Sequence, residues 1–108
     1  MHTTPYAYFS VTKEKLWKGM PFRERQIVKM ILVHGPENPL KVSDLISIPT
    51  LGSPATVHSA LKSLIESGYL KYFTTPNSSR SKFIALTKKS TALIKKINET
   101  LLECASIH

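Results

Sequence analysis

The segment from Ser53 to Gly68 carries the most complete set of local signals in the chain, and it predicts one helix with defined ends. Ser53 supplies a hydroxyl N-cap, Pro54 occupies the first helical position, and Gly68 is the residue type expected just beyond a helix end. At 100° per residue, one side of this helix is apolar and predicts a core stripe of Val57, Leu61, Leu64 and Ile65. The opposite side is then available to solvent or to a partner.

A β-hairpin is predicted directly after this helix. Residues 69–75 are rich in aromatic residues and Thr, residues 76–79 are turn formers, and residues 81–86 form the return strand. Arg80 and Lys82 therefore lie near the tip of the hairpin.

A core helix and three short elements are predicted before residue 53. Pro21 can open a helix that Gly35 ends, and its apolar residues recur at helical spacing: Phe22, Ile27, Val28, Ile31 and Leu32. The following segment predicts a short strand, a brief helix and a turn, over 40–42, 44–48 and 50–52.

The two ends of the chain carry different patterns. Residues 1–20 are expected to form an irregular arm rich in aromatic residues, with a helical turn only from Thr12 to Lys18. Thr87 is positioned to cap a final helix that runs to about Ala105. One side of that helix carries apolar residues at spacings of three and four: Leu93, Ile94, Ile97, Leu101 and Cys104.

Helix, short helix, turn, longer helix and hairpin is the element order of a winged helix-turn-helix, a mainly α fold with a small β-hairpin wing. The 108 residues suit one domain. We divide the chain into an N-terminal aromatic arm (1–20), a winged helix-turn-helix DNA-binding domain (21–86) and a C-terminal helix (87–108).

The positive charge is concentrated in the second half of the chain. The formal net charge is +8, and residues 53–96 hold eight Lys and Arg against one acid, Glu66, which is +7 of that total. Such a balance favours a polyanionic partner through Coulomb attraction and counterion release, and nucleic acid is the obvious candidate. The alternative is that the lysines only keep a small protein in solution.

The sequence lacks the motifs that mark enzymes and metal-binding proteins. There is no nucleophile elbow, Gly-rich phosphate loop, carboxylate pair or His-Glu-x-x-His spacing, so we predict no enzyme, no metal and no cofactor. The single cysteine, Cys104, excludes an internal disulfide, which fits a reducing compartment. Its side chain is either a small buried apolar group or a redox sensor. No signal peptide or membrane span is indicated, so we expect a cytoplasmic protein.

The polar side of the helix at 53–67 is the predicted DNA-reading surface. Small and hydroxyl side chains let a helix approach a duplex closely, and lysine can reach a phosphate or a guanine. His58 is either a groove contact or an ordinary surface residue, since no second metal ligand stands near it. The candidates on this helix are Ser53, Ala55, Thr56, His58, Ser59, Lys62 and Ser63.

Four segments in order resemble the MarR-type winged-helix transcriptional regulators. They are Val-Ser-Asp-Leu at 42–45, Ser-Pro-Ala-Thr-Val-His at 53–58, Leu-Ile-Glu-Ser-Gly-Tyr-Leu at 64–70, and Arg-Ser-Lys at 80–82 followed by Leu86-Thr87. The resemblance spans Pro21 to Ile97 and departs from the family at Ser78, where an aspartate is usual.

This resemblance implies a homodimer on double-stranded DNA. The recognition helix, 53–67, would enter the major groove, and the wing, 75–82, would bring Arg80 and Lys82 to the minor groove. Because few residues precede Pro21, the long N-terminal helix that the family uses to dimerise is not expected. The dimer would then depend on the C-terminal helix and the aromatic arm, and the effector stays open.

Lys88 and Lys89 lie in the first turn of the final helix, where the helix dipole disfavours positive charge. One hypothesis is that both lysines lie along the DNA backbone, and the alternative is a solvated helix end. The sequence also leaves three other functions open: a winged helix for protein assembly, an RNA-binding module, or a phage or plasmid replication accessory protein.

Overall fold

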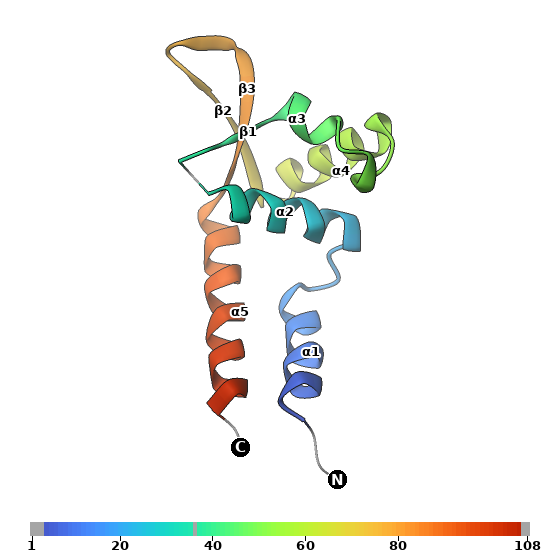
Figure 1. The fold of residues 1–108 in the computed structure, drawn as a ribbon, viewed down its shortest axis with the longest axis vertical. Helices are drawn as coiled ribbons and strands as arrows, with labels where there is room; N and C mark the ends of the chain where they lie inside the picture. The colour runs from blue at the N-terminus through green and yellow to red at the C-terminus, as the bar shows by residue number, and fades with distance from the viewer. Residues whose placement is uncertain (1–3, 36, 107–108) are drawn as a thin grey trace. The chain divides into compact units, whose positions relative to one another are not determined.

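The computed structural model describes residues 4–35 and 37–106. Helices dominate, with one three-stranded antiparallel sheet (Figure 1). The chain divides into two compact units, one made of residues 21–90 and the other of residues 1–20 together with 91–108. The larger unit contains the elements that the sequence predicts for a winged helix-turn-helix.

The larger unit runs from α2 to the first turn of α5. Its elements are α2 (Phe22–His34), β1 (Leu40–Lys41), α3 (Val42–Ile46), the 3₁₀ turn η1 (Pro49–Leu51), α4 (Pro54–Glu66), β2 (Leu70–Thr75), β3 (Ser78–Leu86) and the start of α5 (Lys88–Ser106). This order confirms the predicted fold class, mainly α with a β-hairpin wing. The sheet order is β1-β3-β2, with both pairings antiparallel.

The wing hairpin is longer than predicted. Thr75 pairs with Ser78, so the loop contains only residues 76 and 77, and the return strand begins at Ser78 rather than at residue 81. A register shift falls between Phe73 and Thr75. Serine is a weak strand former, but pairing with β2 outweighs that local preference.

The short helix α3 begins two residues earlier than predicted and ends at Ile46 rather than at residue 48. The backbone N–H of Lys41 donates to the Asp44 carboxylate at 3.1 Å, which is one half of a capping box, and this bond fixes the start of the helix. The predicted turn at 50–52 is the 3₁₀ turn η1, over Pro49–Leu51.

The core of the larger unit is built by α2, α3, α4, the turn η1 and all three strands. Its buried apolar side chains are Ile27, Val28, Ile31, Leu40, Leu45, Leu51, Val57, Leu61, Leu64, Leu70 and Ile84. Two residues expected on the buried side of α2 are exposed instead, Phe22 at 69% and Leu32 at 44%. Phe22 lies nine positions before Ile31, about half a turn away around the helix, so it faces the other side.

The second unit contains α1 (Pro5–Leu16) and most of α5. The prediction of an irregular arm with a turn from Thr12 is therefore wrong. The Thr4 hydroxyl accepts the N–H of Ala7 at 3.1 Å and Pro5 opens the helix, which is the same hydroxyl-proline start as at residue 53. On the apolar stripe of α5, Cys104 is buried and Leu101 is 48% exposed.

Candidate nucleic-acid interface

Helix α4 is fixed by its cap and by one buried side. The Ser53 hydroxyl accepts the N–H of Thr56 at 3.3 Å and lies 2.8 Å from the Thr56 hydroxyl. Val57, Leu61 and Leu64 are fully buried, which confirms these three members of the predicted core stripe. The rotation of α4 about its own axis is therefore set by the core, and the opposite side is turned outward.

The outward side of α4 contains most of the predicted contact residues. Ala55, His58, Ser59 and Lys62 are exposed. Two hydroxyls are occupied within the protein, since Thr56 bonds to Ser53 and the Ser63 hydroxyl donates to Glu24 Oε1 at 3.4 Å. The available surface is thus a strip of small side chains edged by one lysine and one histidine.

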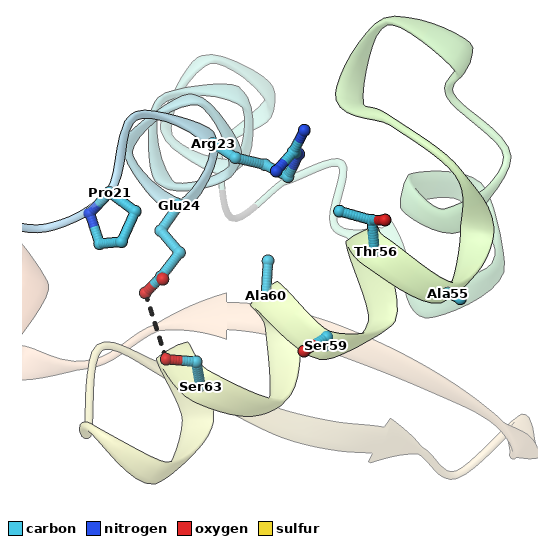
Figure 2. A pocket seen from close by; sticks show the side chains of 8 residues that line it. All are labelled: Pro21, Arg23, Glu24, Ala55, Thr56, Ser59, Ala60 and Ser63. Atoms are coloured by element: carbon cyan, nitrogen blue, oxygen red, sulfur yellow. Dashed lines mark hydrogen bonds between the residues drawn. The ribbon is translucent and has the colours of Figure 1, made fainter.

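A hollow of about 540 Å³ lies between this side of α4 and the start of α2 (Figure 2). Its wall on α2 includes Arg23, whose Nε donates to the Leu51 carbonyl at 2.6 Å, across 28 positions of the chain. Arg23 is not predicted from the sequence, because no local pattern relates it to the turn before α4. The full lining is Pro21, Arg23, Glu24, Ala55, Thr56, Ser59, Ala60 and Ser63.

The turn before α4 requires glycine at residue 52. Gly52 has φ +122° and ψ −172°, a region that is essentially restricted to glycine. A Cβ built there would lie 3.2 Å from Arg23 Nε. Gly52 therefore permits both the path of the chain and the bond from Arg23 to Leu51.

We expect Gly52→Ala to lower the free energy of unfolding by about 2 kcal/mol, through backbone strain and displacement of Arg23. Thermal or urea denaturation measures this loss. Gly19→Ala is the control for a positive-φ glycine without such a contact, since Gly19 has φ +76° and no atom beyond its chain neighbours lies within 4 Å of the added methyl. Its expected loss is about 1 kcal/mol. Equal losses in the two variants would contradict the role of the Arg23 contact.

Lysine side chains of β1 and of the wing lie over aromatic rings of the wing. Lys82 Nζ lies 5.3 Å from the centre of the Tyr72 ring, and Lys41 Nζ lies 5.9 Å from that of Phe83. Arg80 is exposed, and no acid lines the hollow of about 350 Å³ beside it, which is formed by Lys41, Val42, Ser43, Ile46, Arg80, Ser81 and Lys82. Lys41 is a basic residue of this surface that sequence analysis did not select.

The first turn of α5 is bonded to the end of α4. Three consecutive carbonyls accept from it: Ser67 from Lys89 Nζ at 2.8 Å, Gly68 from the Thr87 hydroxyl at 2.6 Å, and Tyr69 from the Ser90 hydroxyl. Lys89 Nζ also lies 4.3 Å from the centre of the Tyr69 ring. Lys89 thus places its charge at the negative end of α4, which offsets its unfavourable position in α5.

We expect Lys89→Met to lower the free energy of unfolding by about 1 kcal/mol, because it removes a cation from a helix C-terminus and from an aromatic ring. Lys88→Met is the control: it makes the same chemical change on an exposed neighbour and should stay within about 0.5 kcal/mol of the parent. Urea denaturation of both variants measures the difference. A larger loss from Lys88→Met would show that the contacts of Lys89 contribute little.

The arrangement of α2, α3, α4 and the β2–β3 wing defines a winged helix-turn-helix protein. Among the described residues, no group of three or more His, Cys, Asp and Glu could hold a metal ion, and no helix is both long and apolar enough to span a bilayer. No protein-family model matches the sequence, and no curated protein matches it.

More particularly, the chain has the fold of the MarR-type transcriptional regulators, as its sequence motifs predict. Transcriptional regulator Tm0710 from Thermotoga maritima matches at a TM-score of 0.69 and 25% identity, over 88% of this chain and 66% of that one. A MepR mutant from S. aureus bound to an oligodeoxyribonucleotide matches at a TM-score of 0.70 and 14% identity, over 90% of this chain and 70% of that one. A MarR-like transcription regulator from Bacillus cereus matches at a TM-score of 0.59 and 17% identity, over 96% of this chain and 76% of that one. The chain spans about two thirds to three quarters of their lengths.

Proposed function

We propose that this protein is a sequence-specific regulator that binds double-stranded DNA. One observation carries the proposal: α4 turns a strip of small side chains and Lys62 outward, while its three core residues hold the helix in that rotation. A helix with side chains is about 10–12 Å across and the major groove is about 12 Å wide, so such a strip can approach base edges.

The charges around α4 agree with this orientation. Arg80 and Lys82 stand on the wing, where a cation suits the narrow and negative minor groove. Lys88 is exposed and is proposed to contact the DNA backbone. Lys89 uses one of its three ammonium donors in the bond to the Ser67 carbonyl, and the other two leave a phosphate contact open. The matching MepR structure holds an oligodeoxyribonucleotide, which supports DNA as the ligand class.

We further propose a homodimer in which α5 supplies the interface. Leu101 and Leu102 leave apolar surface exposed on this helix, at 48% and 70%. A twofold dimer would place its two recognition helices on half-sites about one helical turn of DNA apart.

Selection from a randomised duplex pool at two salt concentrations tests the proposed function. We expect a pseudo-palindrome among the retained sequences and an affinity that falls steeply with salt. The half-site spacing then measures the separation of the two recognition helices. Failure to retain duplex DNA at low salt would refute the proposal and favour a role in protein assembly or RNA binding.

A further inference from the structure

The hollow between α2 and α4 has two chemically different ends. Figure 2 shows the side chain of Arg23 reaching from α2 toward Thr56, near the start of α4, while Glu24 points toward Ser63, about two turns further along. Between these ends the wall on α4 consists of Ser59 and Ala60, which are small side chains, and Ala55 lies beyond Thr56. A group of the size of a phosphate can therefore approach the Arg23 end without displacing protein atoms.

Arg23 is held in place by one bond, and its charge remains available. Its Nε donates to the Leu51 carbonyl at 2.6 Å, which fixes the plane of the guanidinium. Its two terminal nitrogens meet no acceptor among the described residues, and the residue is exposed. A guanidinium with a fixed plane and free terminal N–H groups suits bidentate binding of a phosphate.

The position of Arg23 favours contact with the phosphate backbone of DNA rather than with its bases. A recognition helix nearly fills the width of the major groove, so side chains that flank it on neighbouring elements meet the sugar-phosphate walls. Arg23 is on α2, beside the outward strip of α4 rather than on it. At the other end of the hollow the Glu24 carboxylate repels a phosphate, which restricts the site to the Arg23 end.

We propose that the Arg23 end of this hollow binds a backbone phosphate of the DNA that α4 reads. The Ser59 hydroxyl, exposed on the wall of α4, is a second donor to the same group. The inference rests on the proposed function. It adds a basic contact outside the recognition helix and wing, and it gives Arg23 two simultaneous roles, in the turn before α4 and at the DNA.

The test is the salt dependence of binding to a labelled mixed-sequence duplex of about 30 base pairs, which accommodates two half-sites. A phosphate contact is independent of sequence, so the operator need not be known. We expect Arg23→Gln to reduce the slope of log affinity against log salt by about 0.9 per protomer, which is about 1.8 for a dimer on both half-sites, so the loss of affinity at 0.1 M salt should be roughly sixtyfold larger than the loss at 1 M. Lys29→Gln removes the same charge from an exposed part of α2 outside the hollow, and its slope should match the parent.

Arg23→Lys separates the phosphate contact from the role in the turn. It retains the charge, so its slope should stay close to that of the parent, even though its bond to Leu51 is altered. If Arg23→Gln and Arg23→Lys weaken binding equally with unchanged slopes, Arg23 only positions the turn and the proposed phosphate site is wrong. Thermal denaturation of each variant confirms that it folds, and the Lys variant keeps the comparison valid if the Gln variant is unstable.

The remaining outcomes separate this inference from the function on which it rests. A parent protein that does not bind the duplex overturns both proposals. A parent that binds with a steep slope, together with an unchanged slope in Arg23→Gln, overturns only the phosphate site. Inorganic phosphate that raises the melting temperature of the parent but not of Arg23→Gln, again with equal slopes, would assign the hollow to a free anion instead.

Discussion

Leu61→Ala is expected to lower the free energy of unfolding by about 3 kcal/mol, the largest stability effect that we predict for a single substitution. Leu61 is fully buried on the inner side of α4. Truncation to Ala removes buried methyl groups and leaves a cavity that the surrounding structure fills only in part. In a domain of this size the loss is a large fraction of the total stability.

Denaturation by urea, monitored by circular dichroism, measures this effect. Leu32→Ala is the matched control, because it makes the same chemical change in the same compact unit on a residue that is 44% exposed, and it should cost about 1 kcal/mol. Equal losses in the two variants would mean that α4 does not pack as described. The outward side of α4 would then have no fixed orientation, and the proposed interface would lose its basis.

The elements predicted well from the sequence are those with local boundary signals. Helix α4 runs from Pro54 to Glu66, within one residue of the predicted ends, because its cap, its proline and Gly68 act through neighbouring backbone atoms. The same signal stands at Thr4 and Pro5, yet α1 was not predicted, since its aromatic residues have no amphipathic pattern that marks a helix. A start signal without helical periodicity is easily missed.

The candidate site was predicted only where it lies on one element. The outward residues of α4 follow from its 100° periodicity, and Ala55, Ser59 and Lys62 are indeed exposed. The bond from Arg23 to Leu51 joins segments 28 residues apart, and the bond from Lys89 to Ser67 joins two helix ends. Such contacts depend on how elements pack, which residue periodicity does not encode.

The same limit applies to the charge of the basic face. Lys89 is predicted from the sequence as a DNA contact, and the structure adds a bond from its ammonium to the end of α4. Arg23 and Lys41, which line the two hollows beside α4 and the wing, are not predicted from the sequence. A count of charges along the chain therefore estimates the size of the basic surface, while the packing of elements decides which cations belong to it.

Lys62→Glu is expected to have the largest effect on DNA binding of any single substitution in α4. Lys62 is exposed on the outward side, so reversing its charge removes one cation and adds one carboxylate facing the duplex. If the reversal is equivalent to losing two phosphate contacts in each protomer, the slope of log affinity against log salt falls by about 1.8 per bound protomer, and the loss of affinity at 0.1 M salt is roughly sixtyfold larger per protomer than the loss at 1 M. The fold should be unaffected, since no core residue changes.

Lys29→Glu provides the control that makes this result interpretable. It changes the net charge by the same amount on an exposed residue of α2 that lines neither hollow, so any effect of overall charge appears in both variants. Anisotropy titrations of a labelled duplex over a range of salt concentrations give both slopes. A smaller slope in Lys62→Glu alone places α4 against DNA, because only a cation close to the phosphates displaces counterions from them. Equal slopes in the two variants would mean that DNA binding depends only on the total charge of the protein. Lys62 of α4 would then make no closer contact with the duplex than Lys29 does.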